Sequence, residues 1–496
     1  MKRRYLLQQW ICVGIFIGIS SACAVPFIEA DNRWLRSDVQ ALAEAGVITS
    51  PVTQWPIMWA SVGDDLEKAD SETMATSLLS SFERVRKAYE RASSNKIQGY
   101  SAIEVASDAA IFREFGDSSR EKATFDAALD WVGDNAAIRL QVQAVKDPID
   151  GENVTANGSY LGLVKGNWVF SAGVIDRWWG PGWKNSMILS TNARSFPALS
   201  IQRHYTQPFE SPWLSFIGPW TLETFMGKLE TDRHIPNALL WGLRATFKPV
   251  PALEVGLSRT AIWGGTGRSN SLNAFGHILL GTNENGGNGL TAVNDPSNQQ
   301  AGFDMKWQLT TSEVPLNAYM QYIGDDKLIN GVPSKAIVLY GLEAGQFHTN
   351  WGNYRLFAEY ANTTPSGFQG IRTNNTTYEH SIYQSGYRYR GRSIGATFDN
   401  DSVVTTLGFI GSNYQNQELS MNYSVMNLNR DGTDKSAPGG NSITKTALKL
   451  NALETRYRYY WKQSYIELEA SIYDENVLAF ALDTSNRLSL GYHYEF

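Results

Sequence analysis

Apolar and polar side chains alternate with a period of two in many segments of the chain after residue 97. In AIRLQVQAV (137–145), YQSGYRYR (383–390) and YIELEASI (465–472), every second residue is apolar or aromatic and the residues between them are mostly polar or charged. Successive side chains of a strand point to opposite faces, so each segment has one apolar and one polar face. Segments of about 10 residues with this alternation are typical of a transmembrane β-barrel. A β-sandwich has the same alternation, so the pattern alone leaves both architectures open.

The lengths of the connecting segments favour the barrel. Outer-membrane barrels have short periplasmic turns and long extracellular loops. Short turns are expected at 133–135, 165–167, 248–251, 312–314, 349–351 and 461–464, and long polar segments alternate with them at 146–157, 264–298, 324–335, 362–380 and 428–444. This alternation predicts about 18 to 20 strands with the C-terminus in the periplasm. The stretch 176–218 is the hardest part to assign.

The first 24 residues have the pattern of a secretory signal peptide. Three basic residues in 2–4 precede an apolar run over 10–19, and small residues follow up to Ala24, where cleavage is expected. The apolar run is too short to span a membrane, which takes roughly 20 residues. Both cysteines of the chain, Cys12 and Cys23, lie in this segment, so no disulfide framework is expected after cleavage. Lipidation of Cys23 is a less favoured alternative, because Ser20 stands where lipoproteins favour Leu.

Residues 25–96 are expected to form a small helical bundle in the periplasm. Leu35, Val39 and Leu42 recur at helical spacing before Gly46, and a second amphipathic stretch covers 64–92. The formal net charge is -6, and no basic stripe stands out, which argues against a nucleic-acid partner.

The last ten residues, RLSLGYHYEF (487–496), carry the most specific signal in the chain. Every second side chain from Leu488 to Phe496 is apolar or aromatic, and Phe is the last residue. Tyr492, Tyr494 and Phe496 resemble the signal that the outer-membrane barrel insertion machinery reads, and the two tyrosines suit the membrane interface. We therefore expect residues 97–496 to form an all-β transmembrane barrel of about 18 antiparallel strands, with outer-membrane lipids and the insertion machinery as partners.

The segment RWWGPGW (177–183) packs Trp178, Trp179 and Trp183 around a Gly-Pro-Gly bend. One interpretation makes the three indoles a stacking surface for a glycan. The other makes the motif structural, with the indoles packed in the barrel wall or lumen and Arg194 paired inside a polar lumen. We give the structural interpretation somewhat more weight, because the motif lies between strands and is stiffer than the open loops.

The stretch IDRWWGPGWKNSMILSTNARSFPALSIQR (175–203) and the opening helix RWLRSDVQALAEAGVI (33–48) resemble the Wzi-type capsule-assembly family of outer-membrane proteins. The likeness in layout extends over nearly the whole chain after the signal peptide. It implies a barrel of roughly 18 strands, closed to free diffusion, with a helical bundle at the periplasmic end. It also implies a surface lectin that binds exported capsular polysaccharide, or another extracellular polysaccharide, and holds it on the cell.

The long loops carry residue types that suit a glycan. Aromatic rings stack on the apolar faces of sugars, and guanidinium groups bind carboxylates. We predict glycan contacts for Trp178, Trp179, Trp183, Arg194, Arg268, Phe368, Arg372 and Tyr378. For any single loop residue, the alternative is a solvated, flexible surface.

No catalytic or metal-binding motif stands out. The chain has no G-x-S-x-G, H-E-x-x-H or P-loop sequence, and its six histidines are scattered without the spacing of metal ligands. We therefore expect no enzyme, no cofactor and no metal. The main alternative to a polysaccharide-binding protein is a channel or porin for small solutes or saccharides.

Overall fold

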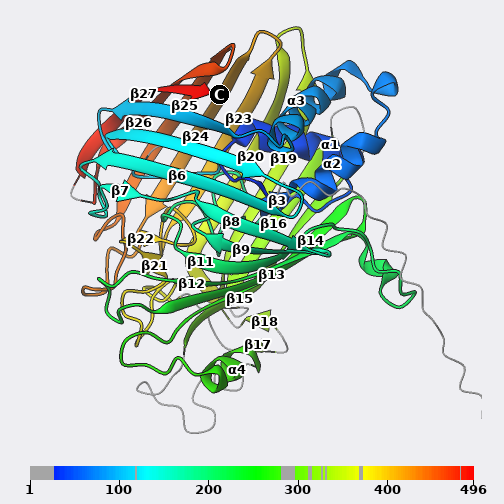
Figure 1. Cartoon of the computed structure of the whole chain (residues 1–496). Coiled ribbons are helices and arrows are strands. Elements are labelled where there is room, and N and C mark those ends of the chain that lie inside the picture. The colour runs from blue at the N-terminus through cyan, green and yellow to red at the C-terminus, as the bar shows by residue number, and fades with distance from the viewer. Residues whose placement is uncertain are drawn as a thin grey trace, which may run out of the picture.

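Eighteen antiparallel strands close into one barrel in the part of the chain that the structure, a computed structural model, describes (Figure 1). The described residues are 27–117, 120–280, 297–310, 315–324, 328–329, 332–333, 335–367, 373–480 and 482–496. The expected signal peptide lies outside them. The barrel strands are β4 (Gln98–Ala106), β5 (Ala123–Val132), β6 (Ala136–Lys146), β8 (Tyr160–Lys165), β9 (Trp168–Gly173), β11 (Ala198–Arg203), β12 (Trp220–Lys228), β13 (Leu239–Val250), β14 (Leu253–Trp263), β15 (Ser297–Gln308), β16 (Leu316–Gly324), β19 (Lys335–His348), β20 (Gly352–Gly367), β23 (Val403–Asn413), β24 (Gln417–Leu428), β25 (Leu448–Trp461), β26 (Ser464–Ala479) and β27 (Leu482–Glu495). The short β7 (Val154–Thr155) prolongs β8, since both pair with β6.

The last strand closes the barrel on the first. β27 pairs antiparallel with β4, from Ser489 opposite Ala106 to Glu495 opposite Tyr100. Closure leaves no strand edge exposed, which a bilayer requires because it offers no hydrogen-bond partner to the backbone. The predicted fold class, an outer-membrane type barrel, is confirmed.

The two faces of the wall show why this is not a sandwich. On β26, Ile466, Leu468 and Ile472 point outward and are 45%, 48% and 49% exposed, while Glu467 and Glu469 point into the lumen and are 2% and 6% exposed. A sandwich would bury the apolar face. An apolar outer face around a polar interior fits a wall surrounded by lipid.

The short turns and the helices gather at one end of the barrel, which is its periplasmic end. The turns expected at 133–135, 165–167 and 349–351 join neighbouring strands, while the turn expected at 312–314 lies outside the described residues. Two further connections at this end, 204–219 and 414–416, were not predicted. The strand number falls at the low end of the expected range, because 174–197 leaves the wall and enters the lumen.

Three helices cover the periplasmic mouth. They are α1 (Arg33–Glu44), α2 (Trp59–Lys68) and α3 (Thr76–Ala92). Asn32 caps α1 by accepting hydrogen bonds of 3.0 Å from two backbone amides of the first turn. The predicted second helix over 64–92 is interrupted, because α2 ends at Lys68 and a 3-10 turn, η1 (Ser71–Thr73), precedes α3. In the part of the chain that the structure describes, no helix is long and apolar enough to cross a membrane.

The remaining elements are short. They are β1 (Phe27–Ile28), β2 (Gln54–Trp55), β3 (Ile57–Met58), β10 (Trp178–Trp179), β17 (Leu328–Ile329), β18 (Val332–Pro333), β21 (Arg388–Tyr389), β22 (Arg392–Ser393), α4 (Leu272–Leu280) and the 3-10 turn η2 (Ser215–Ile217).

Candidate functional site

Segments from both ends of the barrel fill its lumen. Residues 174–197, which we call the plug, run between β9 and β11 and are almost entirely buried. Residues 373–402, which we call the cap, descend from the extracellular end and meet the plug. The connection from β4 to β5 enters from the same side, and α1 enters from the periplasmic side, where the Trp34 indole N–H donates to the Leu419 carbonyl of β24 at 3.3 Å.

The three tryptophans of RWWGPGW are buried inside the barrel. Trp178, Trp179 and Trp183 are 1%, 0% and 3% exposed. Each indole N–H has an acceptor: the Gly182 carbonyl at 3.0 Å, Glu223 at 3.3 Å and Glu343 at 2.8 Å, respectively. Buried indoles with satisfied N–H groups fit a structural role. Their predicted role as a glycan-stacking surface remains untested, and the burial argues against direct contact.

A single glutamine of the wall holds the bend of this motif. Gln321, on β16, donates to the Trp179 carbonyl at 2.8 Å and accepts from the Met187 amide at 2.7 Å. Gly180 lies beside it at a φ of 141°, and a Cβ there would come within 2.8 Å of the Gln321 amide nitrogen. The backbone conformation therefore favours glycine at this position, and any larger residue would have to displace the Gln321 amide.

Paired charges surround the plug. Arg177 binds Glu223 on β12 at 2.6 Å, and Lys184 binds Glu454 on β25. The guanidinium of Arg36, on α1, lies 4.2 Å from the ring centre of Trp183 and donates to the Pro181 carbonyl at 2.7 Å. Buried charges are tolerated when paired, and breaking such a pair is costly, so these contacts fix the plug in one arrangement.

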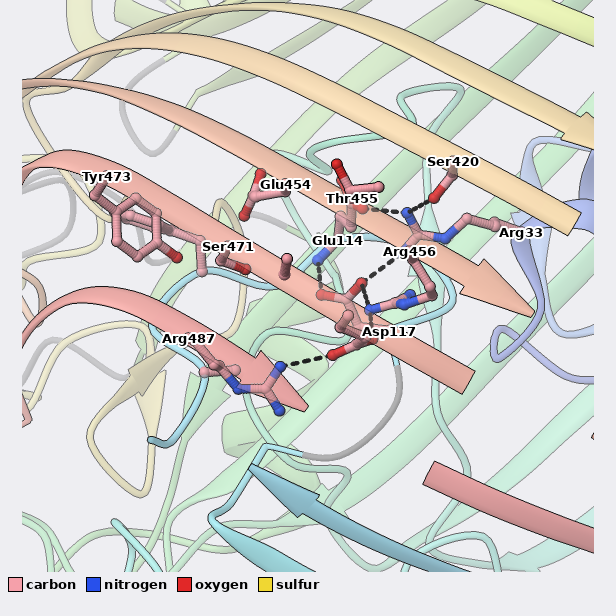
Figure 2. A pocket seen from close by; sticks show the side chains of 14 residues that line it. Arg33, Glu114, Asp117, Ser420, Glu454, Thr455, Arg456, Ser471, Tyr473 and Arg487 are labelled. Carbon is pink, nitrogen blue, oxygen red and sulfur yellow. Dashed lines mark hydrogen bonds and ion pairs between the residues drawn. The ribbon is translucent and has the colours of Figure 1, made fainter. Parts of the chain in front are cut away.

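A small polar cavity between the β4–β5 connection and strands β24 to β27 is lined by charges of both signs. Arg456 binds Asp117 at 2.9 Å and also binds Glu469, which in turn binds Arg487 at 2.6 Å. Figure 2 shows Arg33, Asp117, Arg456 and Arg487 around this cavity. Arg33 reaches the same place from α1 and binds Asp117 at 2.5 Å. These charges, which lie on neighbouring strands, on the β4–β5 connection and on α1, are paired with one another.

The cap is held by its own ion pairs. Arg388 on β21 binds Asp399 at 2.6 Å and Glu379 at 2.7 Å. Asp399 also accepts hydrogen bonds from Ser442, in the neighbouring loop 429–447. Burial raises the pKa of Glu379 despite the nearby Arg388. The pKa of Asp399 falls although burial opposes it, because Arg388 and Ser442 stabilise the carboxylate.

Several non-glycine residues of the cap have left-handed backbone conformations. Asn375, Tyr378, Arg390, Asp399 and Asp401 have φ values of 55°, 60°, 49°, 58° and 51°. Each such residue costs of order 1–3 kcal/mol and persists only where its surroundings hold it. The concentration of these residues in the cap, where Tyr378, Asp399 and Asp401 are buried, therefore indicates that the cap is held in a defined shape.

The residues predicted to bind glycan lie in different surroundings. Arg194 is buried and binds Glu121 at 2.8 Å together with Asp150, and Tyr378 is fully buried. Arg268 is half-buried at the extracellular end, with its guanidinium 5.7 Å from the ring centre of Tyr383. Phe368 and Arg372 lie outside the described residues. Of this set, Arg268 is the described residue nearest to solvent.

The segment YQSGYRYR (383–390) is not the barrel strand that its alternation predicts. Tyr383 and Tyr387 are 1% and 0% exposed within the cap, and only Arg388–Tyr389 form a short strand, β21. Tyr387 donates to the Ile188 carbonyl of the plug at 2.9 Å. Alternation looks the same in a wall strand and in a folded loop, so it did not predict this use of the tyrosines. The feature of the sequence that could have indicated a folded loop is the run of aromatic and basic residues in this segment.

The aromatic residues of the C-terminal strand point outward at the periplasmic rim. Tyr492, Tyr494 and Phe496 are 46%, 40% and 49% exposed. The backbone of Phe496 exchanges two hydrogen bonds of 3.0 Å with Gly99 of β4. Their predicted role as an insertion signal remains a prediction.

The residues that the structure describes hold no group of three or more His, Cys, Asp or Glu side chains placed to bind a metal ion.

The apolar outer wall, the polar and plugged lumen and the helical periplasmic cover define an outer-membrane β-barrel. The chain matches the model of the family described as "Capsule assembly protein Wzi" over residues 92–487. The chain belongs to the Wzi capsule-assembly family.

The chain is also similar to individual proteins in sequence and in structure. An "uncharacterized 55.8 kDa protein in cps region" of Klebsiella pneumoniae is 27% identical over 346 residues, which cover 69% of this chain and 66% of that protein. The solved structure of Wzi from Escherichia coli superposes with a TM-score of 0.81 at 24% identity, and the match covers 95% of this chain and 99% of that one. It is described as an outer-membrane protein involved in group 1 capsule assembly and a carbohydrate-binding β-barrel. OccK10 (OpdN) of Pseudomonas aeruginosa superposes with a TM-score of 0.45 at 10% identity, covering 81% and 98% of the two chains.

Proposed function

We propose that the chain binds exported capsular or extracellular polysaccharide and helps to attach or assemble it at the cell surface, without catalysis. The observation that carries this proposal is the tie between the cap and the plug. Hydrogen bonds from Tyr378 and Tyr387 to plug carbonyls fill the described lumen and hold the cap in one arrangement. A filled lumen under an ordered cap suits binding better than transport, and pre-organisation reduces the ordering cost of binding. The carbohydrate-binding description of the Escherichia coli relative supports the same function.

We place the glycan contacts at the outer surface of the loops, around Arg268. The Arg268 guanidinium lies against the ring of Tyr383 in the cap, and the neighbours of Tyr383 in the chain include the exposed Ser381 and Gln384. Arg372 and Phe368, which lie outside the described residues, remain proposed glycan contacts on the basis of their residue types. Guanidinium groups suit the carboxylates of an acidic polysaccharide. We leave the buried Arg194 and Tyr378 out of the direct contacts, because their polar atoms face protein partners.

The test is the partition of surface polysaccharide between cells and medium. Cells that lack the protein should shed polysaccharide while total synthesis stays unchanged. Cells with R268A/R372A should shed more than the wild type, with the larger difference at low salt, where charge contacts are least screened. A matched control is K87A/K96A, which removes two exposed cations from the periplasmic helical region. Unchanged attachment in cells without the protein would refute the proposal.

A porin or channel is the competing function. Planar-bilayer recordings of the intact protein distinguish the two, because an open lumen conducts ions steadily. We expect near silence, since paired charges and buried aromatic rings occupy the described lumen. Stable single-channel conductance would favour transport.

A further inference from the structure

One connection at the periplasmic end exposes large apolar side chains to its surroundings. Residues 207–217, QPFESPWLSFI, join β11 to β12, and Trp213, Phe216 and Leu214 are 86%, 68% and 41% exposed. Figure 1 shows this green segment projecting from the right-hand end of the barrel. Loops that face water are mostly polar, so exposed apolar side chains that cluster on one loop indicate an interaction surface.

The segment is attached to the lipid-facing side of the wall, not to the lumen. Thr221 and Glu223 point inward, where Glu223 binds Arg177, so Trp220 points outward. Phe209 stacks on the Trp220 indole with ring centres 4.5 Å apart and an interplanar angle of 14°. The guanidinium of Arg203 lies 3.7 Å from the centre of the same indole ring. The segment therefore starts and ends on the outer surface of the barrel.

Trp220 lies at the level of an aromatic girdle. Outward-facing Trp131, Trp307, Trp461 and Tyr494 stand at the periplasmic ends of β5, β15, β25 and β27, and they are 42%, 56%, 64% and 40% exposed. Aromatic residues in such rings sit at the boundary between lipid tails and water. Because Phe209 stacks on a neighbour of this girdle, the exposed residues 213–216 continue an established lipid interface.

Local hydrogen bonds hold the apolar side chains in place before any contact. The η2 turn closes through bonds of 3.0 Å from Ile217 N to Leu214 O and 3.1 Å from Gly218 N to Ser215 O. Gly218 has a φ of 69°, and a Cβ there would come within 1.9 Å of the Lys248 carbonyl oxygen. Gly218 therefore allows the close approach to β13, where the Lys248 amide donates to the Pro219 carbonyl at 2.9 Å and fastens the end of the segment. The turn thus presents a preformed apolar tip.

We propose that residues 207–217 form a lateral anchor that inserts Trp213, Leu214 and Phe216 into the periplasmic phospholipid leaflet of the outer membrane. Trp sits well at this depth, because its ring is apolar while its N–H reaches the headgroups. Glu210 is the one charged residue of the segment, and the segment has no Lys or Arg. Insertion is therefore driven by apolar burial and is insensitive to salt, unlike the attraction of a basic patch to anionic lipid. The anchor fixes the height and tilt of the barrel and is independent of glycan binding.

The test places a reporter at the tip. The chain has two cysteines, Cys12 and Cys23, both in the expected signal peptide, so W213C gives a single labelling site in the protein after cleavage. The folded protein carries an environment-sensitive NBD fluorophore at this site and is reconstituted into phosphatidylcholine/phosphatidylethanolamine vesicles with nitroxide-labelled lipids. N95C, at an exposed position beyond α3, is the water-facing control, and L214C repeats the test if W213C folds poorly. Heat-modifiable gel migration verifies folding of each variant.

We expect a blue-shifted emission at position 213 that lipid nitroxides quench and aqueous iodide does not, with no change in 0.5 M salt. Position 95 should show the reverse. If position 213 behaves like position 95, the anchor does not exist. Quenching that disappears in high salt would also overturn the proposal, because it would show electrostatic surface contact. In cells, a photo-crosslinker at position 213 that yields a protein adduct instead of lipid adducts would assign the tip to a protein partner.

Discussion

The phenol of Tyr378, in the cap, donates a hydrogen bond of 2.6 Å to the carbonyl of Met187, in the plug. The same oxygen accepts a hydrogen bond of 3.0 Å from the Ala396 amide at the far end of the cap. Tyr378 is fully buried and has a φ of 60°. One strained aromatic residue thus joins the two ends of the cap to the segment that closes the lumen.

Removing this hydroxyl should loosen the cap while leaving the barrel folded. Y378F leaves the Met187 carbonyl and the Ala396 amide without their partner, and each buried unpaired group costs about 1–3 kcal/mol. Hydrogen exchange in 373–402 should accelerate about tenfold or more, while exchange in the wall strands stays unchanged. Y423F, which alters a tyrosine that is 47% exposed on the outer wall, is the matched control. Equal protection of the cap in both variants would mean that the hydroxyl does not hold it.

The plug depends on Gln321 in a similar way. Q321L removes the partner of the Trp179 carbonyl and of the Met187 amide in one substitution. We expect the plug of the Q321L variant to open transiently. Planar-bilayer recordings should show these openings as brief current events, whereas the wild-type protein should be nearly silent. A loss of about 1–3 kcal/mol raises the open population roughly 5-fold to 150-fold.

Q463L, in the exposed turn between β25 and β26, is the control for the glutamine-to-leucine change. Silent recordings from Q321L, with folding verified, would show that the plug is held by its other contacts alone.

The cap should also respond to pH through Asp401. Burial raises the pKa of this carboxyl to about 7, and the negative charges of Asp431, Asp399 and Glu379 add to the effect while the Asn375 amide opposes it. The folded cap therefore favours the neutral acid, whose ordinary pKa is about 3.9. The stabilisation is full below about pH 4 and is lost as the pH rises through about 7. After correction for intrinsic rates, exchange in the cap should be faster at pH 8 than at pH 5.5.

D401N separates this titration from other pH effects. The neutral amide keeps an oxygen that can accept the Asn375 N–H, which Asp401 binds at 2.7 Å. Cap exchange in this variant should stay close to its pH 5.5 level at both pH values. A variant that retains the full pH dependence would assign the response to a different group.

The strands of the barrel wall could be predicted from the sequence, because their pattern of outward and inward side chains is set by residues that are neighbours in the chain. Alternation in segments such as 465–472 directly encodes which side chains face lipid, and short turns such as 165–167 encode the hairpins. The pattern misled where a folded loop imitates a strand, as in 383–390. There Tyr387 donates to the Ile188 carbonyl of the plug and Tyr383 donates to the Gly264 carbonyl beyond β14. Periodicity alone cannot distinguish such inward-facing tyrosines from those of a wall strand.

The site was less predictable, because its contacts join residues far apart in the chain. The Trp183 indole donates to Glu343, and its ring contacts the guanidinium of Arg36. The residues around RWWGPGW in the sequence do not indicate either partner. The sequence did identify the motif as important and weighed burial in the lumen against glycan stacking. The anchor at 207–217 was not recognised, because its meaning depends on which side of the wall Phe209 packs.

The C-terminal residue combines two roles that one deletion can separate. Phe496 pairs its backbone with Gly99 where β27 meets β4, and its ring lies 6.0 Å from the ring of Tyr494 on the outer face. Removing Phe496 deletes the last two hydrogen bonds of the closing seam, worth about 0.5–1.5 kcal/mol each, a small part of a long strand pairing. The purified deletion variant should therefore refold in detergent with nearly wild-type heat-modifiable migration. In cells, outer-membrane levels should fall severalfold, because the terminal aromatic residue is predicted to be read by the insertion machinery.

F496Y keeps an aromatic terminus and the backbone pairing, so its levels should stay close to wild type. Normal outer-membrane levels of the deletion variant would refute the predicted signal. Failure of that variant to refold in detergent would instead show that the seam itself needs Phe496, and the loss in cells would then reflect stability rather than recognition.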